Sequence, residues 1–235
     1  MWRNASIDVG FMLRVLPAEG GNLKGKNVFK SLTDALKVAK VGDVIELGQG
    51  HHWEDGDVVV KEGIMIEGDE VAPDKVVVEL SGSFVWEGRG GGCVGVTVRR
   101  PKMGKGCLVH VKDGRCMFVK CVLDATLGDD GEAVAMIGGH RAEVILEETV
   151  IKGSENGWGV KIKGGGVIKL DQSVIVDNAL GGVNVAGREG RSKVEVVDIE
   201  KCTVQSFGGQ GYSGYKNLSA HESAVRSPMK GQYEP

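Results

Sequence analysis

Glu-Glu-Thr-Val-Ile-Lys, residues 147–152, is one of five copies of a short phrase that decides the fold of this chain. The other copies are Gly-Val-Thr-Val (95–98), Val-Lys-Cys-Val-Leu-Asp (119–124), Asp-Gln-Ser-Val-Ile-Val-Asp-Asn (171–178) and Glu-Lys-Cys-Thr-Val-Gln (200–205). Steps of 24, 28, 24 and 29 residues follow when the copies are aligned on Thr97, Cys121, Thr149, Ser173 and Cys202. A period of this size predicts a solenoid, a propeller or another array, and the richness in valine and isoleucine favours strands over helices.

A second phrase runs in step with the first, at 107–111, 133–137, 159–163 and 182–186. Its apolar side chains alternate, which is typical of a strand with one buried face. Two strand phrases per repeat, separated by glycine-rich turns, predict one turn of a coil. The predicted fold is all-β, a right-handed parallel β-helix (solenoid) with small residues stacked inside it. In this register Val122 and Val174 are expected to line the interior.

The composition narrows the class of protein. The 235 residues carry a net charge of −3, which argues against a nucleic-acid binder because such proteins present a basic surface. No apolar run is long enough for a membrane span, and the first residues lack the pattern of a secretory signal. Five cysteines, an odd number without a CxxC pair, are expected to be buried thiols; a disulfide framework or a metal site is the alternative. These features predict an intracellular, cytoplasmic protein.

Three segments are expected along the chain. Residues 1–28 form an N-terminal arm, in which 12–16 is a strand that covers the first turn of the coil. Residues 29–206 form the β-helix, with a capping helix at 31–40 that has Ser31 as N-cap, Asp34 as capping-box partner and Gly42 as stop signal. This helix is expected to plug the open end of the coil. Residues 207–235 form a polar C-terminal tail.

The N-terminal part of the coil resembles a known group. An Ala-Leu-x-x-Ala-x-x-Gly-Asp-x-Ile-x-Leu phrase runs from Ala35 to Leu47, and a glycine and an aromatic-bearing turn follow it. This phrase resembles the N-terminal cap and first coil of the pectin-lyase-like superfamily, and the later phrases resemble its parallel β-helix repeats, also called the carbohydrate-binding and sugar-hydrolase domain. The resemblance covers 29–206 and implies the right-handed β-helix. It leaves the function open, because the superfamily includes lyases, hydrolases, epimerases and non-enzymatic adaptors.

The resemblance also suggests candidate catalytic residues. Asp129 and Asp130 resemble the paired aspartates of the related hydrolases, and His140 resembles their histidine. However, Asp129 and His140 are only 11 residues apart, so both would lie on one turn of the coil instead of facing each other from adjacent turns. The two aspartates also lie between glycines, as in a solvated turn. We therefore predict no catalytic site, with Asp129, Asp130 and His140 as the alternative.

Four residues are candidates for binding. Trp53 and Trp158 are possible platforms for sugar rings. Arg99 and Arg100 resemble the basic elements of pectate lyases, although a charged turn beside Pro101 is the alternative.

No metal or cofactor is predicted. His51 and His52 form the densest group of possible metal ligands together with Glu54. Because the histidines are adjacent on a strand, they point to opposite faces and do not readily bind one ion.

Two functions from different classes are compatible with these residues. The preferred one is a non-enzymatic scaffold in a larger intracellular assembly, which binds other proteins through the solenoid faces and the tail. The alternative is a carbohydrate-active protein that binds or cleaves a polysaccharide. A groove lined by carboxylates over two or more turns would favour the enzyme, whereas a face of apolar and mixed-charge residues would favour the scaffold.

Overall fold

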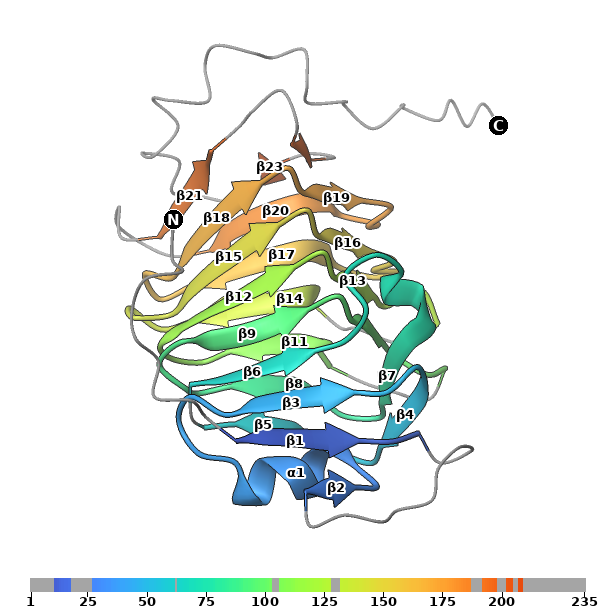
Figure 1. Ribbon diagram of the computed structural model, residues 1–235. Coiled ribbons are helices and arrows are strands. Elements are labelled where there is room, and N and C mark those ends of the chain that lie inside the picture. Colours follow the sequence, from blue (N-terminus) through green and yellow to red (C-terminus); the bar gives the residue numbers. More distant parts are fainter. Residues whose placement is uncertain are drawn as a thin grey trace.

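The chain folds into a parallel β-solenoid (Figure 1). The computed structural model describes residues 11–17, 27–61, 63–102, 106–127, 132–186, 192–197, 202–204 and 207–208. Three parallel sheets run along the coil axis, and each of six consecutive turns, from β3–β5 to β18–β20, adds one strand to every sheet.

Neighbouring strands within each sheet come from successive turns of the coil. Sheet A consists, in order, of β2 (Val28–Phe29), β1 (Met12–Val15), β3 (Val44–Leu47), β6 (Ile64–Glu67), β9 (Gly91–Val94), β12 (Arg115–Val119), β15 (Glu143–Glu147), β18 (Val167–Asp171) and β21 (Lys193–Val196). Sheet B consists of β4 (Gly50–Glu54), β7 (Val76–Leu80), β10 (Thr97–Arg99), β13 (Val122–Asp124), β16 (Val150–Lys152), β19 (Val174–Val176) and β22 (Thr203–Val204). Sheet C consists of β5 (Val58–Val60), β8 (Phe84–Trp86), β11 (Val109–Val111), β14 (Ala133–Gly138), β17 (Trp158–Lys163), β20 (Gly181–Ala186) and β23 (Phe207–Gly208).

The predicted all-β solenoid is confirmed, whereas its right-handedness stays a prediction. The two sequence phrases correspond to sheets B and C. Sheet A supplies a third strand to each turn, which the prediction of two strands per turn missed. The predicted strand at 12–16 is confirmed as β1, which pairs in parallel with both β2 and β3.

The alignment of the first phrase is wrong by one residue at its first copy. Thr97 pairs with Val122 and not with Cys121. The column of small inward residues at the corner between sheets A and B is therefore Val96, Cys121, Thr149, Ser173 and Cys202. A residue with positive φ precedes each of the first four, namely Gly95, Lys120, Glu148 and Gln172 at 63°, 52°, 48° and 47°. At this corner one residue thus adopts the left-handed backbone conformation, and the side chain of the next residue points into the coil.

The prediction that Val122 and Val174 line the interior is wrong. Both side chains are half-buried on the outer face of sheet B, while the next residues, Leu123 and Ile175, are fully buried. A strand residue and its neighbour point to opposite faces, so a one-residue error in register exchanges inside and outside. The second phrase contains a similar error, because Ala133 pairs with Trp158 instead of with Gly159.

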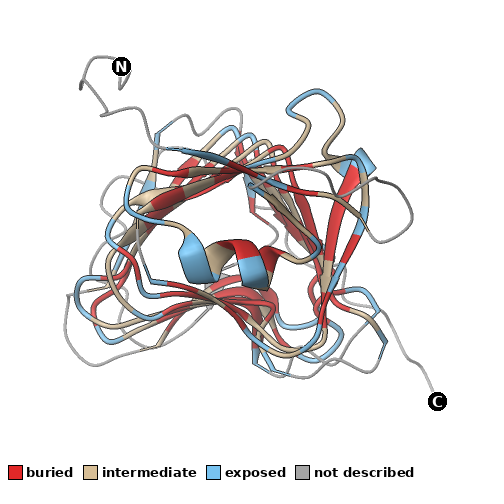
Figure 2. Ribbon diagram, turned by 60° about the horizontal axis from the view of Figure 1, so that its bottom comes forward, coloured by how far each residue is buried: buried red, intermediate tan, exposed pale blue. Residues whose placement is uncertain are grey.

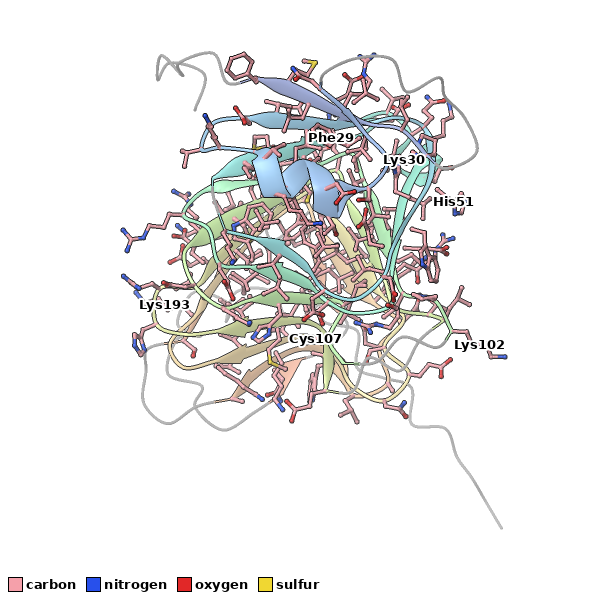
Figure 3. The ribbon with its side chains drawn as sticks, turned by 90° about the horizontal axis from the view of Figure 1, so that it is seen from below. Phe29, Lys30, His51, Lys102, Cys107 and Lys193 are labelled. Carbon is pink, nitrogen blue, oxygen red and sulfur yellow. The ribbon has the colours of Figure 1, made fainter. Side chains whose placement is uncertain are left out.

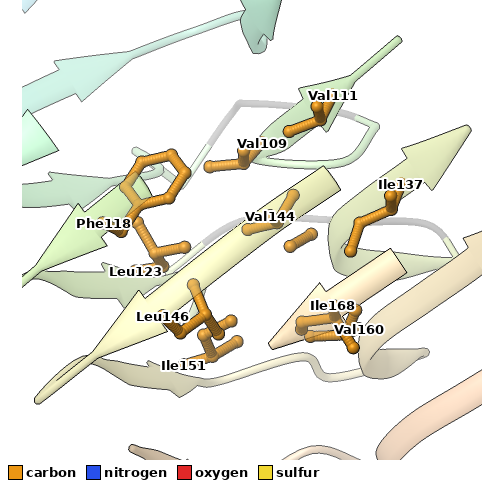
Figure 4. A pocket seen from close by; sticks show the side chains of 11 residues that line it. Val109, Val111, Phe118, Leu123, Ile137, Val144, Leu146, Ile151, Val160 and Ile168 are labelled. Carbon is orange, nitrogen blue, oxygen red and sulfur yellow. The ribbon is translucent and has the colours of Figure 1, made fainter. Parts of the chain in front are cut away.

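The interior of the coil is apolar along its length. Leucine, isoleucine and valine side chains from all three sheets meet there, and Trp86 is completely buried next to Phe84. A small cavity remains between the middle turns, bounded by Phe118, Ile137 and Ile168 among others (Figure 4). Its walls are entirely hydrocarbon, and a cavity of this kind stays dry.

Helix α1 (Leu32–Val38) closes the N-terminal end of the coil, as predicted (Figure 2). Leu32 and Ala35 are buried against the first turn, and the Ser31 hydroxyl accepts a hydrogen bond from the Asp34 amide at 3.1 Å. The helix is shorter than the predicted 31–40 and ends four residues before Gly42. Buried Asp43 accounts for this end, because its carboxylate accepts hydrogen bonds from the amides of Lys40 and Phe11 at 2.8 and 2.9 Å.

Candidate interaction surface

The four predicted binding residues lie on two different sheets. Trp53 on β4 and Arg99 on β10 occupy one outward row of sheet B, since Trp53 pairs with Glu79 and Glu79 pairs with Arg99. Two strand spacings separate Trp53 from Arg99, about 10 Å. Trp53 is 56% exposed, whereas Trp158 is half-buried at the start of β17 in sheet C. The two tryptophans therefore do not form one platform.

The charges around Arg99 compensate one another. The Asp124 carboxylate lies 3.8 Å from Nε of Arg99 and 3.7 Å from Nζ of Lys152. Its Oδ1 atom also accepts hydrogen bonds from the amide and the hydroxyl of Thr126, at 3.0 and 2.5 Å. These contacts occupy both oxygens of Asp124, so the row offers an external ligand few unsatisfied polar groups.

Arg100 is buried, with no exposed surface. It follows Arg99 directly, so the two side chains point to opposite sides of the chain and only Arg99 reaches the surface. The guanidinium of Arg100 acts electrostatically on Cys107, whose pKa is raised by burial and partly lowered again by its hydrogen bond with Ser83 and by this charge. Arg100 is therefore not accessible to an external ligand. In the view along the coil, Cys107 lies nearer the centre than the outward side chains of His51 and Lys193 (Figure 3).

Asp129 and Asp130 lie outside the described residues, so neither the expected solvated turn nor the alternative catalytic role is tested. His140 is exposed in the turn after β14, with Nδ1 at 3.3 Å from the carbonyl oxygen of Gly164. Glycoside hydrolysis requires two carboxyl groups that face the substrate. Of the buried carboxylates in the described ranges, Asp43 and Glu54 bind backbone amides and Asp124 binds Thr126. Each of the three is thus engaged inside the protein.

The two adjacent histidines diverge, as expected. His51 is exposed, while His52 is buried and donates from Nε2 to the carbonyl oxygen of Gly48 at 2.7 Å. Burial lowers the pKa of His52. Glu54 points away to helix α1, where it accepts hydrogen bonds from the amides of Leu32 and Thr33. In the described part of the chain, no three histidine, cysteine, aspartate or glutamate side chains gather as metal ligands would.

The outer face of sheet A carries a group of apolar side chains that was not predicted. Two neighbouring outward rows cross β6, β9, β12 and β15 in register, and both are apolar in the middle turns. We call these half-buried side chains the apolar centre: Met65, Val94, Met117, Val119 and Ile145. Gly92 lies between Met65 and Met117, and a Cβ atom at Gly92 would come within 2.6 Å of Cγ of Met117. The Met117 side chain therefore lies over Gly92, in the space that a larger side chain at position 92 would fill.

Carboxylates flank the apolar centre along the coil axis. In the row of Val94 and Val119, Glu46 and Glu67 pair across β3 and β6, and Glu147 and Asp171 pair across β15 and β18. We call these the acidic pairs. Arg14 holds Glu46 at 2.7 Å, but no basic side chain in the described ranges forms an ion pair with Glu67, Glu147 or Asp171. Like charges directly opposite each other on adjacent strands destabilise a sheet, so the repulsion between Glu147 and Asp171 is not compensated by an ion pair within the described ranges.

The other charged groups on the three sheets are mostly neutralised. On sheet A, Lys169 lies 3.1 Å from Glu143 and 3.4 Å from Glu195. On sheet C, Glu132 lies 3.0 Å from Lys161 and 2.6 Å from Lys163. Among the outward carboxylates of the described strands, Glu67, Glu147 and Asp171 have no ion pair. Glu79 has only a contact of 3.9 Å with His51, and the others pair with lysine or arginine.

The sequence contains a signal for the strands of this face. The second and fourth residues of 115–119, 143–147 and 167–171 are all apolar, and the steps from Phe118 to Leu146 and from Leu146 to Leu170 are 28 and 24 residues, two of the steps of the first phrase. Of the glutamates on this face and its corner, Glu67 and Glu148 are exposed and Glu147 is half-buried. The methionines and valines between them were not assigned to a surface.

Comparisons with protein-family models, with curated proteins and with solved structures give no match for this chain. Among the described residues, no helix is both long and apolar enough to cross a membrane.

Proposed function

We propose that this chain is a non-enzymatic β-solenoid scaffold that binds another protein on the outer face of sheet A. The observation that carries the proposal is the apolar centre, five half-buried side chains gathered on the outside of a sheet whose inner face already fills the core. Contiguous apolar patches on a surface typically mark interaction sites, and methionine adapts well to a partner's shape. A rigid stack of parallel strands holds such a patch in fixed geometry.

The contrast with an enzyme supports this choice. Catalysis of glycosidic cleavage needs carboxyl groups that are free to exchange protons with a substrate. The buried carboxylates of the described turns are engaged by amides and hydroxyls, whereas the uncompensated ones border an apolar surface. This is the mixed apolar and charged face expected of a scaffold.

The test is affinity purification with a matched pair of variants. Met117→Lys places a charge in the apolar centre, and the control Val150→Lys makes the same change on the outer face of sheet B, where Val150 is also half-buried. We expect a defined set of proteins to copurify with the wild type and with Val150→Lys, and to be lost with Met117→Lys. Equal recovery with both variants, each verified as folded by circular dichroism, would contradict the proposal.

Three further features belong to the same proposal. The pectin-lyase-like superfamily is proposed because a capping helix is packed on the first of a series of parallel coils. An intracellular location is proposed because Cys93, Cys107, Cys116 and Cys121 are free thiols. The polar tail at 207–235 is proposed as a second contact for the partner; apart from 207–208 it lies outside the described residues.

A carbohydrate-binding function is the second candidate, and Trp53 favours it. This side chain is 56% exposed and Glu79 lies beside it in the same row, so an aromatic face and one carboxylate are available to a sugar ring. The test is binding to a panel of acidic and neutral polysaccharides by the wild type and Trp53→Ala. Binding that Trp53→Ala abolishes would favour this candidate over the scaffold.

A further inference from the structure

We propose that the segment bound on sheet A is a basic amphipathic helix of another protein, which lies along the coil axis across the apolar centre. This inference rests on the proposed docking function and adds the chemistry of the partner. It is carried by the juxtaposition of the apolar centre with the acidic pairs in one straight row, Glu46, Glu67, Val94, Val119, Glu147 and Asp171.

Charge complementarity indicates that the partner segment is positively charged. Glu67 and Glu147 are the first carboxylates on either side of the apolar centre, and Asp171 follows Glu147 on the next strand. A lysine or arginine placed between Glu147 and Asp171 replaces a like-charge contact by two attractive ones. A partner with acidic residues at these positions would add to the repulsion, so the face selects against it.

The spacing of the row sets the geometry of the partner. Three strand spacings separate Glu67 from Glu147, about 14 Å. A helix rises about 1.5 Å per residue, so basic residues at positions i and i+11 lie on one face about 16 Å apart, within reach of both carboxylates through their long side chains. Apolar residues at i+4 and i+7 lie between them on the same face and meet Val94 and Val119.

The apolar centre favours a helix over an extended segment. An extended chain laid across the outer face of a sheet finds no edge to pair with, so its amides and carbonyls would be pressed unsatisfied against hydrocarbon. A helix satisfies these groups internally and presents only side chains. A second copy of the described part of this chain does not supply such a helix, because α1 has 7 residues and buries its apolar side on the first turn of the coil.

The experiment uses the full chain and a fluorescent helical peptide of about 18 residues that carries lysine at i and i+11 and leucine at i+4 and i+7. Its twin carries glutamine in place of both lysines. Binding is measured by fluorescence anisotropy in about 50 mM and about 500 mM NaCl, since salt screens exposed charges. The protein variants are Glu147→Gln/Asp171→Asn and, as control, Glu155→Gln, which removes an exposed carboxylate from a turn.

We expect the lysine peptide to bind the wild type about tenfold more tightly than its glutamine twin in low salt, and the difference to shrink in high salt. Glu147→Gln/Asp171→Asn should remove this preference, and Glu155→Gln should keep it. Equal affinity for both peptides would overturn the inference that the partner is basic, while the proposed docking surface would remain. No binding of the lysine peptide would overturn the inference that the partner segment is a helix. If the full chain forms a dimer and Met117→Lys dissociates it, the face binds a second copy of this chain instead.

Discussion

At the scale of single residues, the corner between sheets A and B depends on small polar side chains that turn inward. The Thr149 hydroxyl accepts a hydrogen bond from the Cys121 amide at 3.3 Å and lies 2.9 Å from the carbonyl oxygen of Phe118. The Ser173 hydroxyl repeats the pattern one turn later, where it accepts from the Thr149 amide at 3.2 Å. Each hydroxyl thus satisfies a buried amide of the preceding turn that the sheet ladders leave unpaired.

Thr149→Val is expected to lower the free energy of unfolding by about 1–3 kcal/mol, because the buried Cys121 amide loses its acceptor. Thr149→Ser keeps the hydroxyl and loses one methyl group, about 1 kcal/mol. Urea denaturation followed by circular dichroism measures both changes. A Thr149→Val protein as stable as the wild type would show that the hydroxyl of Thr149 contributes nothing to stability.

At the scale of elements, helix α1 is fastened to the coil by one buried side chain. Glu54 on β4 is 3% exposed, and its two oxygens accept from the amides of Leu32 and Thr33 and from the Thr33 hydroxyl. A carboxylate at a helix N-terminus also interacts favourably with the helix dipole. The cap of the solenoid is therefore tied to the second strand of the first turn.

Glu54→Gln is expected to cost about 1.5–3 kcal/mol, because an amide has one acceptor oxygen and no charge for three donors. The control Asp34→Asn removes an exposed carboxylate that pairs with Lys37 on the helix surface, and it should cost less than Glu54→Gln. Thermal unfolding of both variants provides the comparison. Equal losses would mean that the buried contact does not fasten the cap.

The register of sheet B gives a second prediction at this scale. Ile175 is fully buried and its neighbour Val174 faces outward, so Ile175→Ala should cost about 2–5 kcal/mol and Val174→Ala about 1 kcal/mol or less. Chemical denaturation measures the difference. A larger loss of stability for Val174→Ala than for Ile175→Ala would support the register in which Val174 lines the interior.

The strands of sheets B and C were predictable because valine and isoleucine recur in them at a regular period. Sheet A was missed because its outward positions hold apolar residues such as Met117, Val119 and Ile145 as well as charged ones, so apolar residues do not alternate along its strands. The one-residue slip at Thr97 arose because threonine was aligned with Thr149 by likeness of side chain. Gly95, Lys120, Glu148 and Gln172 share a positive φ and mark the true alignment, but only the glycine reveals this conformation in the sequence.

At the scale of the whole molecule, the stability of the coil is expected to decrease as the pH falls from about 7.5 to about 5.5. Burial lowers the pKa of His52, and burial followed by the charges of Lys112 and Lys163 lowers the pKa of His110. The unfolded chain therefore takes up protons more readily than the folded one below about pH 6.5. His52→Gln should reduce the decrease in midpoint temperature over this range. A pH dependence that neither His52→Gln nor His110→Gln changes would contradict this account.

The candidate surface could be predicted only in part, because it depends on which turns of the coil align. The sequence identified Trp53 and Arg99, and the register places them in one row of sheet B. It also suggested Arg100, which the register turns inward. Met65, Met117 and Ile145 are spaced at 52 and 28 residues in the chain, and only the stacking of β6, β9, β12 and β15 makes them one surface.

The outer face of sheet A is proposed as the surface that binds another protein. Site-specific photocrosslinking tests it most directly, with a photoreactive phenylalanine at position 117 or, as control, at position 150 of the full chain in cells that naturally make it. We predict that irradiation links position 117 to one defined protein, identified by mass spectrometry, and that position 150 gives no such product. A crosslink to that protein at 150 and none at 117 would contradict the account.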